Sequence, residues 1–442
     1  MTLIVGANNS GKSAFLEAAH HAAKALTYEQ VSIAQPRRNM GSEHTSVTVE
    51  AERGQVLRVA TINRGGSQMR AQWDEDQQPS PPVSIRDTPA RRAFNPYFHL
   101  NQSDDPSWHL HAGELSRTET RDAFTGRLVA LDADPERKRR FNELLAEVVG
   151  YELEWTIDQM SDSQTFVKML GEGGWHTSEG LGEGLVSLLF IVDALYDSAP
   201  GSLVVIDEPE LSLHPPLIRR LRRVFSRFAA TRQILLATHS PQLIDWADIR
   251  NGAAIARVFK EPMSGASVVR QASRKTLTEI ARLAADRNLY HPHTVGVQAA
   301  EAFFLEDGII ITEGQDDVVF APRVLEDLGL PPSDRFFGWG AGGAHNIVKL
   351  VTLFAELGFT RIATLFDNDK LDEAEKVRER FPTVVVEVLP APDIRFKDEQ
   401  PAKPEVVGLL EPDKRTVRAE LRSEAAEVFT RLLDAVTPHA HR

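Results

Sequence analysis

The chain has 442 residues, a formal net charge of -13 at pH 7 and no cysteine. A chain of this length is expected to form two or three domains, each with its own core. The acidic balance excludes a uniformly basic surface for nucleic acid, so any contact with DNA must be local or use metal ions. Without cysteine, disulfides, thiol nucleophiles, zinc ribbons and cysteine-ligated iron–sulfur clusters are excluded.

The hydropathy of the chain predicts a soluble, cytoplasmic protein with no membrane partner. The most apolar stretch, residues 184–192, is about half as long as a membrane span requires. The N-terminus also lacks the basic and apolar regions of a signal peptide.

In the first half of the chain, some segments have a clear secondary-structure pattern and others do not. Residues 1–30 predict a strand, a glycine-rich turn and a helix. Alternating polar and apolar residues over 45–73 predict short antiparallel strands, whereas 75–125 has no clear period. Residues 135–149 predict an amphipathic helix with a solvated basic start. Its expected apolar side comprises Phe141, Leu144, Leu145 and Val148.

The second half returns to regular alternation. Residues 181–243 alternate between strand and helix, and 246–306 are predicted to be mostly helical. From Gly308 onward, strands and helices alternate, which predicts a compact parallel α/β domain. The expected strands are 308–312, 335–339, 361–366 and 384–389. The expected helices are 316–328, 344–357, 371–380 and 416–436.

A phosphate-binding loop is predicted near the N-terminus. The string GANNSGKS, residues 6–13, matches G-x-x-x-x-G-K-[ST] between an apolar strand and a helix. Backbone amides would surround the phosphates, Lys12 would reach the β- and γ-oxygens, and Ser13 would bind magnesium. The expected nucleotide-binding residues of this loop are Gly6, Asn8, Asn9, Ser10, Gly11, Lys12 and Ser13.

Two later strands end in polar residues that suit the same site. The apolar strand 202–206 is followed by Asp207 and Glu208, and adjacent carboxylates at a core edge are costly unless a cation binds them. We expect Asp207 near the magnesium and Glu208 beside the attacking water. The similar strand 234–237 precedes His239, which is expected to contact the γ-phosphate.

The order of these motifs resembles the ABC-type ATPases of the SMC and DNA-recombination class. The resemblance rests on the phosphate loop, on LGEG at 181–184 before a hydrophobic helix, and on the strings IDEPELSLHP and ATHSPQLID. It implies a dimer of ATPase heads in which Gly182 and Gly184 of one subunit close the nucleotide site of the other. Three features depart from the usual pattern. Ser178 lies four residues before Gly182, and Gln35 and Gln102 both compete as the Q-loop glutamine. Such heads usually have strands before the phosphate-loop strand that help hold adenine, whereas this sequence starts almost at that strand, so either its start is late or the ATPase core is trimmed.

Acidic residues also follow two apolar strands in the C-terminal half. Glu313 and Asp317 come after 309–312, whereas Asp367 and Asp369 follow 362–366. The carboxyl ends of parallel strands share one edge, and Asp367 and Asp369 share a face while the chain stays extended. Converging carboxylates repel one another unless divalent cations neutralise them, and oxygen ligands favour Mg²⁺ or Mn²⁺ over zinc. Asp316 is expected to be a charge at a helix N-terminus.

The Glu-Gly and Asp-x-Asp pattern resembles a Toprim domain. In that family the glutamate and both aspartates bind metal at a phosphodiester site, which implies these roles for Glu313, Asp367 and Asp369. Asp317 matches the additional acidic position of the nuclease branch. A topoisomerase is disfavoured because all five tyrosines precede these strands, and a primase because its cysteine zinc module is absent.

An ATPase head joined to a C-terminal Toprim domain resembles the OLD family (overcoming lysogenisation defect) of ATP-dependent nucleases, whose relatives include the Gabija defence nuclease. The expected fold class is α/β, with an ABC-type P-loop ATPase domain followed by a Toprim parallel α/β domain. The expected divisions are a head over 1–245 with an insertion about 75–165, a helical connector over 246–306, a Toprim domain over 307–390, and a tail with a helix over 391–442.

The resemblance implies an ATP-binding DNA endonuclease that depends on Mg²⁺ or Mn²⁺ and acts in phage defence or DNA processing. Glu313, Asp367 and Asp369 would serve two-metal catalysis, and Glu208 and His239 would serve ATP hydrolysis. The implied partners are DNA, a second copy or higher homo-oligomer, and an accessory protein. One alternative is an ATP-driven DNA-binding or repair clamp in which the Toprim domain is a docking platform. Another is a toxin-like effector held inactive by a partner.

Two sets of basic residues are candidates for contact with DNA. Nucleases of the OLD family place a lysine near the scissile phosphate, and the tail offers Lys397, Lys403 and Lys414. The arginines within 219–223 lie on a predicted helix whose apolar side is expected to hold Leu217, Leu221, Val224 and Phe228. A solvated helix face is the favoured interpretation of these arginines.

Overall fold

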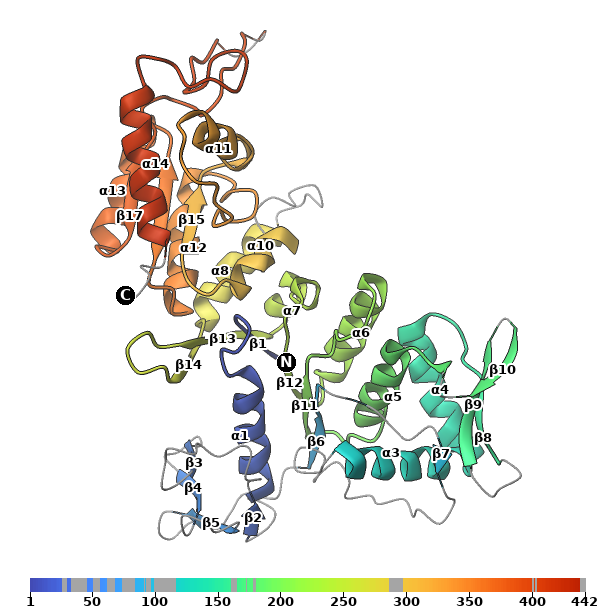
Figure 1. Cartoon of the computed structure of the whole chain (residues 1–442). Helices are drawn as coiled ribbons and strands as arrows, with labels where there is room; N and C mark the ends of the chain where they lie inside the picture. Colours follow the sequence, from blue (N-terminus) through green and yellow to red (C-terminus); the bar gives the residue numbers. More distant parts are fainter. Residues whose placement is uncertain are drawn as a thin grey trace. The chain divides into compact units, whose positions relative to one another are not determined.

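The chain forms two compact units. A computed structural model describes residues 1–25, 30–32, 46–50, 56–61, 68–73, 84–90, 92, 97–98, 117–159, 165–171, 173–177, 180–285, 297–399, 401 and 404–437 (Figure 1). The first unit comprises Met1–Leu3 and Gly11–Thr238, and the second comprises Ile4–Ser10 and His239–Arg442. The division passes through β1 (Thr2–Val5), so each unit contains part of this strand. No helix in the described ranges is both long and apolar enough to span a membrane.

The first unit is built on a largely buried sheet. Its strand order is β1, β12 (Gln233–Ala237), β11 (Leu203–Asp207) and β6 (Ile85–Thr88), and β11 runs parallel to both of its neighbours. The interior positions of β11 are apolar and buried, as expected for a strand covered on both faces. Helix α1 (Lys12–Ala25) contacts β6, β11 and β12, and helix α5 (Glu183–Tyr196) contacts β6 and β11.

Two smaller antiparallel sheets complete the strands of the first unit. One has the order β2 (Gln30–Ser32), β5 (Gln68–Trp73), β4 (Val56–Thr61) and β3 (Ser46–Glu50). It confirms the antiparallel strands predicted over 45–73. In the other, β9 (Thr165–Gly171) pairs with β10 (Gly174–Thr177), β7 (Tyr97–Phe98) and β8 (Trp155–Gln159).

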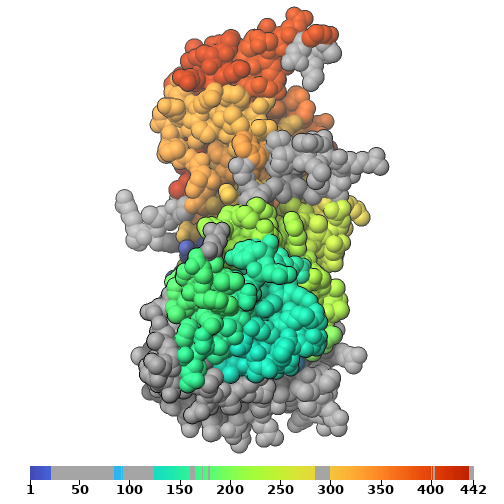
Figure 2. Space-filling view, turned by 90° about the vertical axis from the view of Figure 1, so that its right-hand side faces the viewer, coloured from blue at the N-terminus to red at the C-terminus, as the bar shows by residue number. Residues whose placement is uncertain are grey.

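Helices α3 (Arg117–Asp132) and α4 (Pro135–Val149) pack against each other, and α4 also contacts α5 and α6 (Pro215–Phe228). In Figure 2, residues from the later part of α3 to β10, coloured turquoise to green, lie on the face of the first unit that is turned toward the viewer. Helix α4 has the predicted bounds because Asp134 caps its start and Gly150 ends it with φ 95°. Its predicted apolar side is buried, and Arg139 pairs with Glu136 on the exposed face.

The apolar side predicted for α6 is partly wrong. Leu221 and Val224 are buried as expected, but Ile218 and Phe225 complete the buried face instead of Leu217 and Phe228. The periodic pattern allows either choice, and packing against α4 decides it. On the polar side, Arg227 pairs with Glu147 of α4 at 2.7 Å.

The second unit contains a hairpin that the sequence does not predict. Strands β13 (Ala254–Lys260) and β14 (Ser267–Gln271) form an antiparallel hairpin, and β13 lies beside β1. The prediction of mostly helical structure over 246–306 is therefore wrong at 254–271. The short helices α7 (Trp246–Arg250), α8 (Arg274–Ala285) and α10 (Val297–Glu301) occupy other parts of this segment.

A three-stranded parallel sheet forms the centre of the second unit, in the order β15 (Ile309–Thr312), β16 (Ile362–Phe366) and β17 (Val385–Val388). The helices α11 (Gln315–Asp327), α12 (Ala344–Glu356) and α13 (Leu371–Arg380) confirm the predicted alternation. Helix α14 (Arg422–Val436) begins six residues later than predicted. The strand predicted over 335–339 is wrong, because Phe336 makes only an isolated bridge to Ile310 before a glycine-rich loop.

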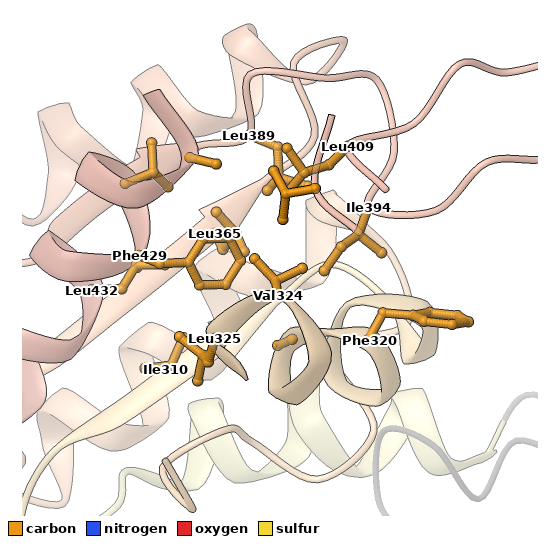
Figure 3. Packing of buried hydrophobic residues seen from close by; sticks show 14 of the residues in the cluster. Ile310, Phe320, Val324, Leu325, Leu365, Leu389, Ile394, Leu409, Phe429 and Leu432 are labelled. Atoms are coloured by element: carbon orange, nitrogen blue, oxygen red, sulfur yellow. The ribbon is translucent and has the colours of Figure 1, made fainter. Parts of the chain in front are cut away.

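The segment after β17 contributes to the core of this unit. Figure 3 shows Leu389, Ile394 and Leu409 packed with side chains of the strands and helices. The other labelled members are Ile310, Phe320, Val324, Leu325, Leu365, Phe429 and Leu432. The burial of Ile394 and Leu409 fixes the course of the chain beyond the third strand, which also positions the polar residues between them.

Candidate functional site

The predicted phosphate loop has the backbone conformation of a tight turn between β1 and α1. Gly6, Asn9 and Gly11 have φ of 139°, 60° and 107°. A Cβ atom at Gly6 would lie 2.2 Å from the carbonyl oxygen of Val258, so only glycine fits there. The loop leads into the N-terminus of the 14-residue helix α1, where unpaired amides favour anions.

The structure brings Lys12, Ser13, Asp207 and Glu208 together. The Ser13 hydroxyl donates a hydrogen bond to the Asp207 carboxylate, yet burial raises the pKa of Asp207 above its usual value. Asp207 Oδ1 is buried and has no hydrogen-bond partner among the described residues. Lys12 is 5% exposed, and burial lowers its pKa. The negative charges of Glu208 and Asp207 raise the pKa and so offset part of this effect. The exposed Ser13 hydroxyl, the unpartnered carboxylate oxygen of Asp207 and the buried Lys12 ammonium together suit a Mg²⁺-bound triphosphate.

Arg92 is a residue of this site that sequence reasoning missed. Its guanidinium donates to Ser187 Oγ at 2.7 Å and to the carbonyl oxygens of Glu208, at 3.2 Å, and Asp207. Burial lowers the pKa of Arg92 to about 10, so the side chain remains charged at neutral pH. It therefore holds the backbone of Asp207 and Glu208 and offsets part of their charge. The only signal was an arginine within an aperiodic segment.

Glu210 is a second missed residue, and it adds a third carboxylate to the IDEPELSLHP string. Its charge opposes the lowering of the Lys12 and Arg92 pKa values. Glu208 itself has φ 46°, which bends the chain immediately after β11. A left-handed conformation at a non-glycine residue is unusual and frequent at functional sites.

The two glycines predicted to close a partner's site have different surroundings. A Cβ atom at Gly184 would lie 2.4 Å from the carbonyl oxygen of Ser212, so this glycine is required for packing within the chain. Gly182 precedes α5 and has open space where a side chain would extend. His239 directly follows Thr238 and is the first residue of the C-terminal part of the second unit. Ser178, Gln35 and Gln102 lie outside the described residues.

In the second unit, three predicted acidic residues are close enough to affect one another. Burial and the charges of Asp317 and Glu313 raise the pKa of Asp367 to about 8. Burial likewise raises the pKa of Asp317 to about 7, although its carboxylate accepts a hydrogen bond from Gly314 N at 2.8 Å. The pKa of Glu313 is raised by burial, and its carboxylate accepts from the amide of Ala344. Glu313 Oε2 and Asp367 Oδ1 have no hydrogen-bond partner among the described residues.

Asp369 differs from the expectation. The chain turns directly after β16, where the amide of Lys370 donates to the carbonyl of Asp367 at 3.0 Å. The premise of an extended Asp-x-Asp segment is therefore wrong. Asp369 is exposed and its Oδ2 pairs with Lys370 Nζ at 2.6 Å, although its charge still contributes to the raised pKa values of Glu313 and Asp367.

Asp393 is a carboxylate of this cluster that sequence reasoning did not assign. It is buried in the segment after β17, and its charge raises the pKa values of both Asp317 and Asp367. Lys397 Nζ pairs with Asp393 and lies 3.7 Å from Asp316 Oδ2. Asp316 is in the first turn of α11, as expected, and also accepts from Arg395 Nε at 2.7 Å. Position after a third parallel strand was the signal that could have revealed Asp393.

The glycine-rich loop between α11 and α12 packs against the backbone of Glu313 and Gly314. Its four glycines 338, 340, 342 and 343 all have positive φ, which prevents the predicted strand. A Cβ atom at Gly340 would lie 2.5 Å from the Gly314 carbonyl oxygen, and Gly343 N donates to the Glu313 carbonyl at 2.9 Å. The absence of a side chain at Gly340 therefore serves a close approach to the protein's own backbone.

The donor chemistry of the cluster suits a hard divalent cation. Carboxylates with unpartnered buried oxygens and raised pKa values are the groups whose charge a cation would offset. Within the ranges that the structure describes, no three His, Cys, Asp or Glu side chains have converged enough to hold one ion together. Binding would therefore require these side chains to reorient.

Residues 87–245, which include Asp207 and Glu208, match the family described as "AAA domain, putative AbiEii toxin, Type IV TA system". No curated protein matches the chain. Three solved structures show similarity at low identity. The first is an SMC head bound to the C-winged helix domain of ScpA, with 15% identity, a TM-score of 0.39, and coverage of 63% of this chain and 91% of that chain. The second is the SMC head of Thermotoga maritima, with 15% identity, a TM-score of 0.32, and coverage of 62% of this chain and 90% of that chain. The third is an Smc head with an extended coiled coil bound to the C-terminal domain of ScpA, derived from Pyrococcus furiosus, with 14% identity, a TM-score of 0.40, and coverage of 64% of this chain and 93% of that chain. The family match shows that the chain contains an AAA-type ATPase domain.

Proposed function

We propose that this chain is an ATP-binding, divalent-metal-dependent DNA endonuclease whose cutting site is the acidic cluster of the second unit. The observation that carries the proposal is the placement of two buried carboxylates, Asp317 and Asp393, near the half-buried carboxylates of Glu313 and Asp367 beside a parallel sheet. Burying several negative charges together costs folding free energy. Carboxylates with strongly shifted pKa values cluster at functional sites. The arrangement is consistent with the resemblance to Toprim domains.

Glu313, Asp317, Asp367 and Asp393 would hold the cations through oxygen donors. When bound, Mg²⁺ or Mn²⁺ would neutralise the carboxylates and supply Lewis-acid chemistry for phosphodiester hydrolysis. Asp369 is a weaker candidate than the sequence suggested, because it is exposed and paired with Lys370.

Lys397 is the tail lysine that we propose to bind the scissile phosphate. Burial lowers its pKa, but its hydrogen bond with Asp393 and the charges of Asp393 and Asp316 raise the pKa overall. The ammonium therefore stays charged beside the acidic cluster at neutral pH. Lys414 is exposed in a turn, and Lys403 lies outside the described residues.

The ATPase domain would regulate cleavage. Lys12 would bind the β- and γ-phosphates, Ser13 and Asp207 would hold Mg²⁺, and Glu208 would orient the attacking water. The contact between Ser13 and Asp207 supports these roles. We also propose that heads dimerise through the open N-terminal end of α5 at Gly182, with His239 completing the site, and that the protein acts in phage defence or DNA processing.

One observation favours the clamp alternative, in which the second unit only docks DNA or a partner. In the described part of the chain, the carboxylates have not converged into a group that could hold one metal ion. A clamp would retain ATP binding and bind DNA, but it would not hydrolyse phosphodiester bonds.

Plasmid cleavage separates the two functions. Supercoiled plasmid is incubated with the protein in the presence and absence of Mg²⁺, Mn²⁺ and ATP, and nicked and linear products are measured. Asp367→Asn should abolish cleavage, because the amide removes a metal-binding charge. Asp372→Asn should cleave like the parent, because Asp372 is exposed on α13. An inactive parent that still binds ATP would favour the clamp, and equal cleavage by parent and Asp367→Asn would exclude this site.

A further inference from the structure

A cavity of about 260 Å³ adjoins the predicted phosphate loop. Every residue that lines it belongs to the second unit. Ala7, Asn8 and Ser10 of the loop contribute to its wall, and Arg257 and Phe259 of β13 contribute as well. This volume is near the lower end of the roughly 300–1,000 Å³ typical of small-molecule pockets, so it suits a ligand of nucleoside size.

The wall formed by β13 provides an aromatic ring beside a buried cation. The Arg257 guanidinium carbon lies 5.0 Å from the centre of the Phe259 ring. Phe259 also packs over Gly358, where an added Cβ would lie 2.5 Å from the ring atom Cε1. The ring is therefore held in place by its neighbours. Aromatic rings and guanidinium groups are the side chains on which nucleobases stack most readily.

Arg257 is buried without a carboxylate among its hydrogen-bond acceptors. It is 1% exposed, and it donates to the carbonyl oxygens of Leu357 at 3.3 Å, Leu305 at 3.1 Å and Glu306. Its Nε has no hydrogen-bond partner among the described residues. The Phe359 ring lies 3.8 Å from the guanidinium carbon, and the charge of Asp307 opposes the lowering of the Arg257 pKa by burial, so the protein itself offsets part of the positive charge beside the cavity.

Two further groups favour a polar ligand. The buried Ser10 Oγ has no hydrogen-bond partner among the described residues. Lys260 adds a second positive charge to the cavity wall and is exposed. Asp307, which also lines the cavity, already accepts hydrogen bonds from both Thr360 and Arg361. Its charge is thus largely committed to the protein.

We propose that this cavity binds the nucleoside part of the ATP whose phosphates occupy the loop, with the purine stacked on Phe259. The proposal rests on the proposed ATP-binding function and adds the place of the base. The loop residues Asn8 and Ser10 belong to both the phosphate turn and the cavity wall, so one nucleotide can engage both. Asn8, Ser10 and Thr360 offer polar groups to the ribose or to the edge of the base.

Isothermal titration of the full chain with ATP and with inorganic tripolyphosphate, each with Mg²⁺, tests the proposal. The parent should bind ATP more tightly than tripolyphosphate, because only ATP has a base to stack. Phe259→Ala should weaken ATP binding at least about fivefold and leave tripolyphosphate binding unchanged. Phe259→Tyr should bind ATP as tightly as the parent, because it keeps the aromatic ring that Phe259→Ala removes. Met263→Ala is the matched control, because Met263 is 100% exposed in the turn of the same hairpin.

The outcomes distinguish this proposal from the proposed function. A parent that binds neither ligand would overturn ATP binding and, with it, the proposal. A parent that binds ATP and tripolyphosphate equally would overturn the cavity assignment alone. The same conclusion would follow if Phe259→Ala left ATP binding unchanged or weakened both ligands equally.

A second measurement needs no substitution. Photolabelling of the parent with 8-azido-ATP should modify the segment 257–262, which carries the aromatic and cationic wall, and excess ATP should block the modification. Peptide mapping by mass spectrometry identifies the labelled segment. Labelling confined to other parts of the chain would place the base elsewhere and overturn the proposal.

Discussion

Among the neighbouring charges, Asp317 contributes most to the raised pKa of Asp367, after the effect of burial. Asp317 is at the start of α11 and Asp367 follows β16, so residues about fifty positions apart meet at the acidic cluster. Their pKa values of about 7 and about 8 mean that protons can replace a cation near neutral pH. The cluster therefore links proton binding, cation binding and stability.

The stability of the metal-free protein should fall as pH rises from about 4 to about 8. Asp317 and Asp367 have folded-state pKa values far above the usual value for aspartate, so the folded state holds more protons than the unfolded state in this window. Their stabilising effect is complete below pH 4 and is lost as pH rises through 7 and 8. Melting temperature in EDTA, measured across this range, provides the test.

Substitution at Asp367 should remove part of that pH dependence. Asp367→Asn should raise the melting temperature at pH 8.5 in EDTA, because it removes a buried negative charge. Adding Mg²⁺ or Mn²⁺ should stabilise the parent more than this variant. Asp372→Asn should follow the parent at every pH, since Asp372 is exposed. A parent whose stability rose between pH 6 and pH 8 in EDTA would contradict the raised pKa values.

Lys397 should be required for cleavage but not for nucleotide binding. Lys397→Met removes the cation that pairs with Asp393 beside the acidic cluster, and the loss of one electrostatic contact of this type costs about a hundredfold or more in rate. Lys414→Met is the control, because Lys414 is an exposed lysine of the same segment. Plasmid cleavage and ATP titration are measured together. If both variants cleaved equally, Lys397 would have no part in the reaction.

Glu208 and Lys12 should have separable effects on the ATPase. Lys12→Ala should weaken nucleotide binding, because it deletes the charge expected at the β- and γ-phosphates. Glu208→Gln should retain binding and slow turnover about a hundredfold or more, because the amide is a poor base for water. Glu152→Gln is exposed and should match the parent in phosphate release. Turnover at the parent rate in Glu208→Gln would show that another group, with Glu210 as a candidate, orients the water.

Local patterns predicted the parts of this protein that local physics determines. The strand, turn and helix around Lys12 and the helix over 135–149 follow from periodicity and capping, which act over a few residues. Strand β13 was not predicted because its pairing with β1 joins segments about 250 residues apart. The turn at Asp367 was missed because a strand pattern does not show where extension ends.

The missed site residues have the same explanation. Arg92 acts through contacts with Ser187 and with the backbone of Asp207, both about a hundred positions away. Asp393 joins Asp317 and Asp367 only because the chain after β17 packs into the core of the second unit. No pattern in the neighbouring sequence reports the contacts of Arg92, and the only signal for Asp393 was its position after a third parallel strand.

DNA binding should depend strongly on divalent cations. A net charge of -13 prevents bulk attraction to DNA, so the phosphates must be reached through cations at Glu313, Asp317, Asp367 and Asp393 and through a few local basic groups. Fluorescence anisotropy of a labelled duplex, titrated across a salt series with Mg²⁺ or with EDTA, measures this dependence. EDTA should remove most of the affinity at moderate salt, and the slope of log affinity against log salt should be shallow.

The combined change Asp367→Asn and Asp393→Asn should mimic EDTA in DNA binding and leave ATP hydrolysis intact, because Ser13 and Asp207 belong to the other unit. Tight binding in EDTA with a steep salt slope would instead show that a basic surface holds the DNA, which would favour the clamp over the nuclease.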